Sequence, residues 1–293
     1  MLRQHNGSVP EMPEVEALVG FLGDHLIGRV VARLDVAGIA ALKTYDPPVT
    51  SLGGLTISGV GRRGKFIDID VDGLHLVVHL ARAGWVRWRE SLPATPLKPG
   101  KGPIVLRVHL DDGSGLDVTE AGTKKKLAVY VVRDLADVPG IARLGPDPLT
   151  LDRATFDALL DDHARTQLKG LLRSQAVIAG IGNAYSDEIL HVACVSPFAL
   201  AGRLDDAGRD RLFAAIGSTL RDAIDRSIGL PASELKDDKR AAMRVHGRTG
   251  QECPECGDVV REVSFADSSL QYCATCQTGG KPLADRRMSR LLK

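Results

Sequence analysis

Hydrophobic residues between about Val30 and Val132 alternate with polar ones or gather in short runs, and turn sequences separate these stretches. A period of two is typical of strands with one buried face, and many short strands joined by tight turns indicate a sandwich or barrel. Asp72-Gly73 and Asp111-Asp112-Gly113 are such turns. We therefore expect strands that include residues 30–36, 65–71, 74–80, 104–110 and 127–132.

Helical periodicity precedes and follows this β-rich region. Hydrophobic residues of the segment 13–26 fall on one stripe, which predicts an amphipathic helix. The sequence changes character around residues 140–149, where Leu144-Gly-Pro-Asp-Pro148 predicts a linker. Beyond it, the apolar spacing predicts helices over residues 153–164, 167–174, 185–193, 205–228 and 232–244.

Composition adds little by itself. The chain has 293 residues, enough for two domains, with 44% hydrophobic and 26% charged residues, as in an ordinary soluble protein. No apolar run approaches the ~20 residues of a membrane span, and the first residues lack a secretory signal, so we expect a cytoplasmic location.

The net charge of +1 does not predict a nucleic-acid partner, but the basic residues are clustered. The clusters are Arg62-Arg63-Gly64-Lys65, Lys124-Lys125-Lys126 and the tail over residues 281–293. A phosphate-binding face needs only local positive charge. Each cluster alone is equally consistent with a solvated surface.

Four of the five cysteines form the array C-x2-C-x16-C-x2-C at Cys253, Cys256, Cys273 and Cys276. This spacing is typical of a zinc ribbon with four thiolate ligands, and disulfides are a weaker explanation in a cytoplasmic chain. Four thiolates leave no position for water, so we expect one structural Zn²⁺. Cys194, in an apolar run, is expected to be a small buried hydrophobic residue.

A second pattern runs from Lys169 through Gly180-Ile-Gly-Asn183 to Leu190. Two helical stretches flank a glycine-containing turn, and Asn183 is expected to be the N-cap of the second helix. Such a turn exposes backbone N–H groups that suit a phosphate. An ordinary helix connection, with Lys169 on the surface, is the alternative.

The third pattern is Val9-Pro10-Glu11-Met12-Pro13-Glu14-Val15-Glu16. Taken alone, it is consistent with a helix start that carries favourable carboxylates in its first turn. Together, and in this order, the three patterns resemble the formamidopyrimidine-DNA glycosylase/endonuclease-eight family. That family opens with M-P-E-L-P-E-V-E, carries a lysine on a hairpin after a basic turn, contains G-I-G-N in a helix–two-turns–helix element and ends in a four-cysteine finger.

The resemblance covers the chain from Val9 almost to its end and implies an α+β fold. It predicts an N-terminal β-sandwich with flanking helices over residues 10–140, a helix–two-turns–helix domain over 150–245, and a zinc finger with a basic tail over 246–293. Residues 1–9 are expected to be an extension. The implied partner is double-stranded DNA containing damaged bases or abasic sites, and the chain is expected to be a monomer, associated with the nucleoid when bound to DNA.

The resemblance also implies a mechanism. Pro10 matches the family's nucleophile, whose secondary amine attacks C1′ of the damaged nucleotide; the iminium that forms promotes β- and δ-elimination. Glu11 matches the acid/base carboxylate, and Lys65 matches the hairpin lysine that contacts the DNA backbone. Lys169 and Asn183 match phosphate-binding positions, whereas Glu14 matches a further active-site glutamate, with helix capping as its alternative. The implied activity is removal of oxidised bases, purines being favoured, followed by strand cleavage.

The chain departs from the family at several positions. Pro10 follows nine residues, so its nitrogen is an amide; translation from a GTG codon at Val9, cleavage of an extension and loss of activity are three alternatives. The family's H-L-G-M-S-G is His79-Leu-Ala-Arg-Ala-Gly84, so His79 and Arg82 are expected to face DNA. D-x-R-x-F-G has become Glu120-Ala-Gly-Thr-Lys-Lys-Lys-Leu127, which contains Lys125, and Asp267-Ser268 replaces a G-R pair at the finger tip.

These departures leave two further hypotheses beside a glycosylase with lyase activity. A protein that has lost catalysis and only binds damaged DNA would explain the extension. An unrelated zinc-ribbon regulator would explain neither the octapeptide nor the G-I-G-N element.

Overall fold

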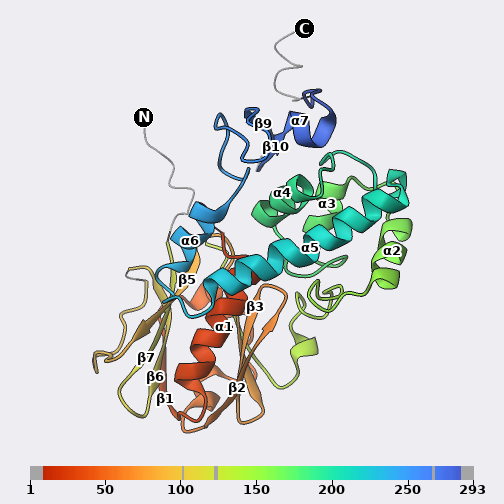
Figure 1. The fold of residues 1–293 in the computed structure, drawn as a ribbon. Coiled ribbons are helices and arrows are strands. Elements are labelled where there is room, and N and C mark those ends of the chain that lie inside the picture. Colours follow the sequence, from red (N-terminus) through yellow and green to blue (C-terminus); the bar gives the residue numbers. More distant parts are fainter. Residues whose placement is uncertain (1–8, 101, 122–124, 266–267, 285–293) are drawn as a thin grey trace. The chain divides into compact units, whose positions relative to one another are not determined.

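The computed structural model describes residues 9–100, 102–121, 125–265 and 268–284, and the chain divides into two compact units (Figure 1). Unit 1 comprises Met1–Arg143 and Arg226–Asp238, and unit 2 comprises Leu144–Asp225 and Lys239–Lys293. Lys124, Asp267, residues 1–8 of the extension and the tail from 285 onward lie outside the described residues. No helix within the described ranges has both the length and the apolar character needed to cross a bilayer.

Unit 1 is built on two four-stranded antiparallel sheets, with strand orders β1-β6-β7-β5 and β2-β3-β4-β8. The expected Asp72-Gly73 turn joins β3 to β4, and both residues have positive φ (52° and 81°), as a two-residue type I′ hairpin requires. The strands are β1 (Val31–Val36), β2 (Ile57–Arg63), β3 (Phe66–Val71), β4 (Leu74–His79), β5 (Gly84–Arg89), β6 (Ile104–Leu110), β7 (Gly115–Glu120) and β8 (Ala128–Val132).

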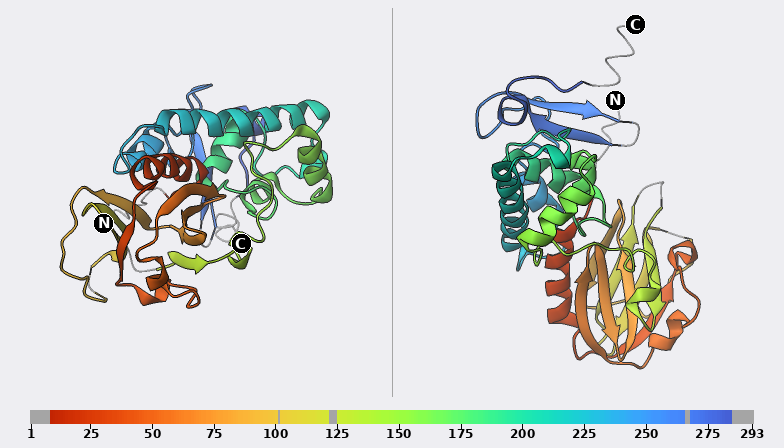
Figure 2. Two further views of the ribbon diagram at one scale, coloured as in Figure 1. Left: turned by 90° about the horizontal axis from the view of Figure 1, so that it is seen from below. Right: turned by 90° about the vertical axis from the view of Figure 1, so that its right-hand side faces the viewer.

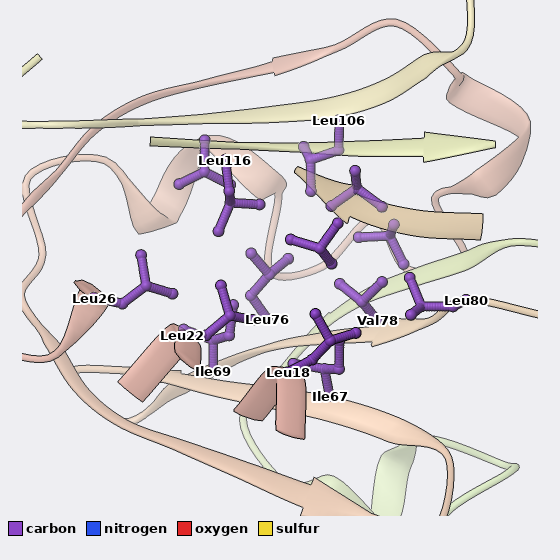
Figure 3. Packing of buried hydrophobic residues seen from close by; sticks show 14 of the residues in the cluster. Leu18, Leu22, Leu26, Ile67, Ile69, Leu76, Val78, Leu80, Leu106 and Leu116 are labelled. Atoms are coloured by element: carbon purple, nitrogen blue, oxygen red, sulfur yellow. The ribbon is translucent and has the colours of Figure 1, made fainter. Parts of the chain in front are cut away.

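The core of unit 1 lies between the two sheets and helix α1 (Met12–Leu26). Leu18 and Leu22 of α1 point toward Ile67 and Ile69 of β3, and Leu106 and Leu116 of the other sheet close the cluster (Figure 3). Figure 2 (right) shows α1, in red, alongside the strands. The segment 226–238 completes this core, since Leu235 is fully buried in it and Trp85 Nε1 donates to the Ala232 carbonyl at 2.8 Å.

Unit 2 combines helices with a small zinc-finger hairpin. The buried carboxylate of Glu188 accepts three backbone N–H bonds, from Arg244, Val245 and His246, and so fixes the segment that leads into the finger. The elements are α2 (Arg153–Asp162), α3 (Leu168–Arg173), α4 (Asn183–Val192), α5 (Asp206–Ser227), β9 (Val260–Ser264), β10 (Ser269–Cys273) and α7 (Ala274–Thr278). Helix α6 (Leu235–Ala242) begins in unit 1 and ends in unit 2.

The expected fold class is therefore confirmed, with corrections in detail. Gly182, not Asn183, is the N-cap of α4, and Asn183 is its first residue. Cys194 is exposed rather than buried and has a φ of 54°, so it lies in a turn that follows α4 and not in an apolar core.

Candidate active site and metal centre

Pro10 and Glu11 lie immediately before α1, where a capping box fixes the backbone. Glu11 is the N-cap; its backbone N–H donates to Glu14 Oε2 at 2.8 Å, and its side chain accepts from the backbone of Glu14. Both carboxylates are almost fully buried, at 2% and 1% exposure, and Pro10 is buried as well. Glu14 therefore has the capping role that was its alternative, and the capping box fixes the conformation of Glu11.

The β2–β3 hairpin lies at the same end of unit 1 as the start of α1. The C-terminal end of α1 lies beside the start of β2, because the Gly28 N–H donates to the Ile57 carbonyl. Glu16, in the first half of α1, forms an ion pair with Arg62 near the end of β2. Arg62 Nη1 also donates to the carbonyl of Gly64, the first turn residue of the hairpin, at 3.2 Å. Gly64 has a φ of 57°, and Lys65 is the second turn residue. The Glu16–Arg62 pair therefore joins the Lys65 turn to α1, the helix that follows Pro10 and Glu11.

His79 is opposite Phe66 in the β3–β4 ladder, and the two rings are 4.6 Å apart between centroids. Burial, together with the positive charge of Lys65, lowers the pKa of His79 to about 4. The imidazole is neutral at neutral pH. It can accept or donate one hydrogen bond there without adding a charge to the Lys65 turn.

Two loops complete this end of the sandwich. The turn from Leu80 to Gly84 is closed by a backbone bond of 2.8 Å, and Arg82 lies exposed at its tip. A side chain at Gly84 would place its Cβ 2.2 Å from the Leu80 carbonyl oxygen, so this close turn requires glycine.

Glu120 shapes the second loop. At the end of β7, its carboxylate is 3% exposed and accepts the backbone N–H groups of Lys126 and Leu127, at 2.6 and 2.9 Å. Lys125 and Lys126 consequently lie exposed next to β8, whose first residue, Ala128, pairs with His79. The register thus brings Pro10, Glu11, Glu14, Lys65, His79, Arg82 and Lys125 to one end of unit 1.

In unit 2, Lys169 and Asn183 meet in the helix–two-turns–helix element. Lys169 is 5% exposed, and its ammonium donates to the Asn183 carbonyl at 2.7 Å and pairs with Asp187 at 2.6 Å. Asp187 also contacts His246 Nδ1 at 2.8 Å. Asn183 Nδ2 donates to the carbonyl of Ser269 in the finger hairpin, at 2.9 Å. Lys169 is therefore a buried, paired lysine, and Asn183 joins α4 to the finger.

The four cysteines of the finger form a compact cluster in which the ligand atoms all lie within 4.8 Å of one another. Cys256 and Cys273 sulfurs are 3.4 Å apart and Cys253 and Cys276 sulfurs 3.8 Å apart. A tetrahedral Zn²⁺ with bonds of about 2.3 Å separates its sulfurs by ~3.8 Å, so the cluster fits the ion. Burial raises the pKa of the Cys273 thiol to about 11 and that of Cys276 further, and a divalent cation would overcome this penalty by binding the thiolates.

Family comparisons agree with this arrangement. The chain matches the formamidopyrimidine-DNA glycosylase N-terminal domain over residues 9–124, the H2TH domain of the same enzymes over 144–232, and the zinc finger found in FPG and IleRS over 250–279. A formamidopyrimidine-DNA glycosylase of Desulforamulus reducens is 31% identical over 287 residues, which cover 92% of this chain and 99% of that protein. The chain belongs to the formamidopyrimidine-DNA glycosylase family.

Two further relatives define the similarity. An uncharacterized formamidopyrimidine-DNA glycosylase-like protein of Mycobacterium tuberculosis is 57% identical over 159 residues, which are 54% of this chain and all of that protein. The Lactococcus lactis enzyme in complex with DNA containing an oxidised pyrimidine has a TM-score of 0.81 at 25% identity, covering 92% of this chain and all of that one. A complex of the L. lactis protein with abasic-site DNA has a TM-score of 0.80 at 24% identity and shows the common fold.

Membership in this family confirms the expected enzyme class, that of DNA glycosylases, and the structural zinc at Cys253, Cys256, Cys273 and Cys276. Several residues that shape the two sites were not expected from the sequence. Glu16, Arg62, Asp187 and His191 act through partners distant in the chain, whereas Glu120 binds two backbone N–H groups of the loop that follows it. Glu16, Arg62, Glu120 and Asp187 lie within stretches that the sequence singles out, but the contacts that they make were not predicted.

Proposed function

We propose that this chain removes oxidised bases from double-stranded DNA and then cleaves the strand at the resulting abasic site. The observation that carries this proposal is the position of Pro10 and Glu11 at the end of the sandwich that also carries Lys65 and His79. The proposed nucleophile, a carboxylate and a cation lie at this same end, and glycosyl transfer to an amine requires such groups.

In the proposed reaction, the Pro10 nitrogen forms a bond to C1′ as the bond between C1′ and the base breaks, and the leaving base takes up a proton. The amine then loses its proton, and the C1′–O4′ bond opens as O4′ takes up a proton, which leaves an iminium between Pro10 and the opened sugar. This iminium withdraws electrons from the sugar, so the 2′ proton is lost and the 3′ phosphate leaves. A second elimination releases the 5′ phosphate, and hydrolysis frees Pro10. Glu11 carries protons between the sugar and the base, and Lys65 stabilises the adjacent DNA phosphate.

This chemistry needs a free secondary amine at Pro10. While Val9 precedes it, the nitrogen is an amide whose electron pair is delocalised into the carbonyl, so the proposal includes removal of the residues before Pro10 or initiation at Val9. An α-amine is less basic than the lysine side chain, so a larger fraction is unprotonated at neutral pH.

The proposed substrates are oxidised purines first, with oxidised pyrimidines and abasic sites also accepted. Support comes from the family's name and from the L. lactis relative, whose complexes contain an abasic site or an oxidised pyrimidine. The base must leave the helix to reach Pro10, which costs a few kcal/mol. In this proposal, Arg82 and Lys125, which are exposed at the same end of unit 1, contact DNA. Lys169 and Asn183 hold the helix–two-turns–helix element in the conformation that binds a DNA phosphate. We further propose that the protein acts as a monomer.

A second candidate is a protein of this fold that binds damaged DNA without cleaving it. The peptide bond between Val9 and Pro10 and the structural engagement of both Glu11 and Glu14 in helix capping favour it. The two candidates differ in strand cleavage, and they share DNA binding.

Lys65→Ala tests the proposal in a chain that begins at Pro10. Arg29→Ala is the matched control, because Arg29 is a partly exposed basic residue paired with Asp112 at the opposite end of unit 1. On a duplex with one oxidised purine, we expect Lys65→Ala to slow single-turnover cleavage by about 100-fold, within the range for a group that acts in the transition state, and Arg29→Ala to leave it unchanged. Equal losses in both variants would remove Lys65 from the mechanism, and DNA binding without cleavage by the unsubstituted chain would establish the second candidate.

A further inference from the structure

Helix α4 reaches the zinc centre through one side chain, His191. Its Nε2 lies 3.2 Å from Sγ of Cys253. Both residues are buried, with exposures of 1% and 2%. The other ring nitrogen, Nδ1, is also buried and has no hydrogen-bond partner among the described residues.

This arrangement assigns the ring proton. A neutral imidazole carries one N–H, and a buried N–H without an acceptor costs about 1–3 kcal/mol. Since Nδ1 has no acceptor among the described residues, the favourable tautomer has its proton on Nε2. That proton points at the Cys253 sulfur, which as a zinc-bound thiolate is an acceptor.

Other sulfurs of the cluster receive hydrogen bonds from the finger itself. The backbone of Asp258 bonds to Cys256, which lowers the pKa of that thiol, and the backbone of Cys276 bonds to Cys273. The bond to Cys253 is different because its donor is a side chain of the helix–two-turns–helix element, 62 residues earlier in the chain. The Cys253 sulfur is thus hydrogen-bonded to α4, a part of unit 2 outside the finger.

We propose that His191 is an outer-shell donor to the zinc site, which holds the Cys253 thiolate and slows release of the metal. Four thiolates and one Zn²⁺ carry a net charge of −2, and two of these cysteines, Cys253 and Cys273, are almost fully buried. An N–H donor withdraws negative charge from the sulfur it contacts and fixes its orientation, which is the general role of second-shell partners in metal sites. This inference depends on the zinc centre alone and holds whether or not the chain cleaves DNA.

The finger has other attachments to the same part of unit 2 that do not involve sulfur. Asn183 Nδ2 donates to the Ser269 carbonyl, and Gln277 Nε2 donates to the Val195 carbonyl at 3.0 Å. Loss of the His191 bond should therefore change the metal centre more than it changes the docking of the finger. This difference distinguishes a role of His191 as hydrogen-bond donor to the metal site from a role in packing alone.

Three variants of the full chain test the proposal. His191→Phe keeps a planar ring of similar size without a donor, and His191→Gln keeps an N–H near the position of Nε2. Tyr272→Phe is the matched control, because it removes one hydrogen bond of the finger, from Leu283 N–H to the Tyr272 hydroxyl at 2.7 Å, that does not involve sulfur. Zinc transfer to an excess of a chromogenic chelator measures the release rate.

We expect His191→Phe to release zinc at least 10-fold faster than the unsubstituted chain, in line with the usual effect of outer-shell partners, and the other two variants to stay within about 3-fold of it. Replacement of zinc by Co²⁺ gives a second readout. In His191→Phe the thiolate-to-cobalt charge-transfer band should move to lower energy, because the Cys253 sulfur is more electron-rich without its hydrogen bond. The band of His191→Gln should match that of the unsubstituted chain.

Unchanged release and an unchanged band in His191→Phe would overturn the proposal. Equal acceleration in His191→Phe and His191→Gln would also overturn it, because ring packing and not the N–H would then hold the metal. If His191→Phe does not fold, His191→Gln decides alone: an unsubstituted-type band and release rate support the donor, and a shifted band with fast release refutes it.

Discussion

The buried pair of Lys169 and Asp187 offers a quantitative test of how the helix–two-turns–helix element is held together. The two side chains are 7% and 0% exposed, and their charged atoms are 2.6 Å apart. Removing one member of such a pair leaves a buried charge without its partner and costs about 3–5 kcal/mol. Asp187→Asn keeps an oxygen near Lys169 but removes the charge, so we expect the lower end of this range, ~3 kcal/mol. Lys169→Met should cost a similar amount, because His246 remains beside Asp187.

The double variant Lys169→Met/Asp187→Asn should be at least ~2 kcal/mol more stable than the sum of the two single losses predicts, because neither charge is left alone. Urea unfolding can follow the two units separately. Both tryptophans, Trp85 and Trp88, belong to unit 1, whereas most of the helices belong to unit 2 and dominate the circular dichroism. We expect the midpoint of the dichroism transition to fall by about 1 M in each single variant, with the tryptophan transition unchanged. Strictly additive losses would refute the coupling between these two charges.

Four further predictions follow from the two sites. His79 should titrate by NMR with a pKa of about 4. Between this value and about pH 6.5 the unfolded chain binds more protons than the folded chain, so the contribution of neutral His79 to stability is complete above about pH 6.5 and is lost as the pH falls toward 4. His79→Gln should flatten this pH dependence of stability. Glu16→Gln should destabilise unit 1 by no more than about 1 kcal/mol, because Glu16 is partly exposed, yet slow strand cleavage by loosening the Lys65 turn; an unchanged cleavage rate would contradict this role. Glu120→Ala should lower the stability of unit 1 by ~2–4 kcal/mol, because the backbone N–H groups of Lys126 and Leu127 lose their acceptor. Glu120→Gln should lower it by less, and thermal melts followed by tryptophan fluorescence compare the two variants. Cys253→Ser should abolish stoichiometric zinc and unfold the finger; retained zinc with unchanged DNA affinity, measured by elemental analysis and titration, would contradict a structural role for the metal.

The sequence predicts most of the elements of this fold because hydrophobic spacing reports on burial. The helix expected over residues 13–26 is α1 (Met12–Leu26), and the strand expected over 104–110 is β6 (Ile104–Leu110). Three strands of unit 1, β2, β5 and β7, are not among those expected. In β7 all six residues are buried, and Asp117 lies among them because Arg107 of the adjacent strand pairs with it. In the sequence alone, a charged residue inside a strand predicts an exposed position, because its ion-pair partner is not visible there.

The candidate sites show the same division between local and long-range information. The octapeptide, the G-I-G-N turn and the cysteine spacing are local, so they were sufficient to identify the family. The contacts that position these groups join residues far apart in the chain, such as Glu16 with Arg62 and His191 with Cys253. Hydrogen-bond partners at such separations follow from the folded arrangement and have no signature in the spacing of residues.

The central claim is that Pro10 becomes the nucleophile when its nitrogen is a free amine. Borohydride trapping on a duplex with one abasic site tests it directly, because the reagent reduces an iminium between amine and sugar to a stable covalent link. The 293-residue chain and a chain beginning at Pro10 are compared after intact-mass analysis of both. The predicted result is a covalent adduct from the shorter chain and none from the 293-residue chain. The adduct should also be lost when Pro10 of the shorter chain is replaced by an N-acetylated glycine, which has no free amine. No adduct from either chain, with abasic-site binding retained, would contradict the proposed mechanism and favour a damaged-DNA-binding protein.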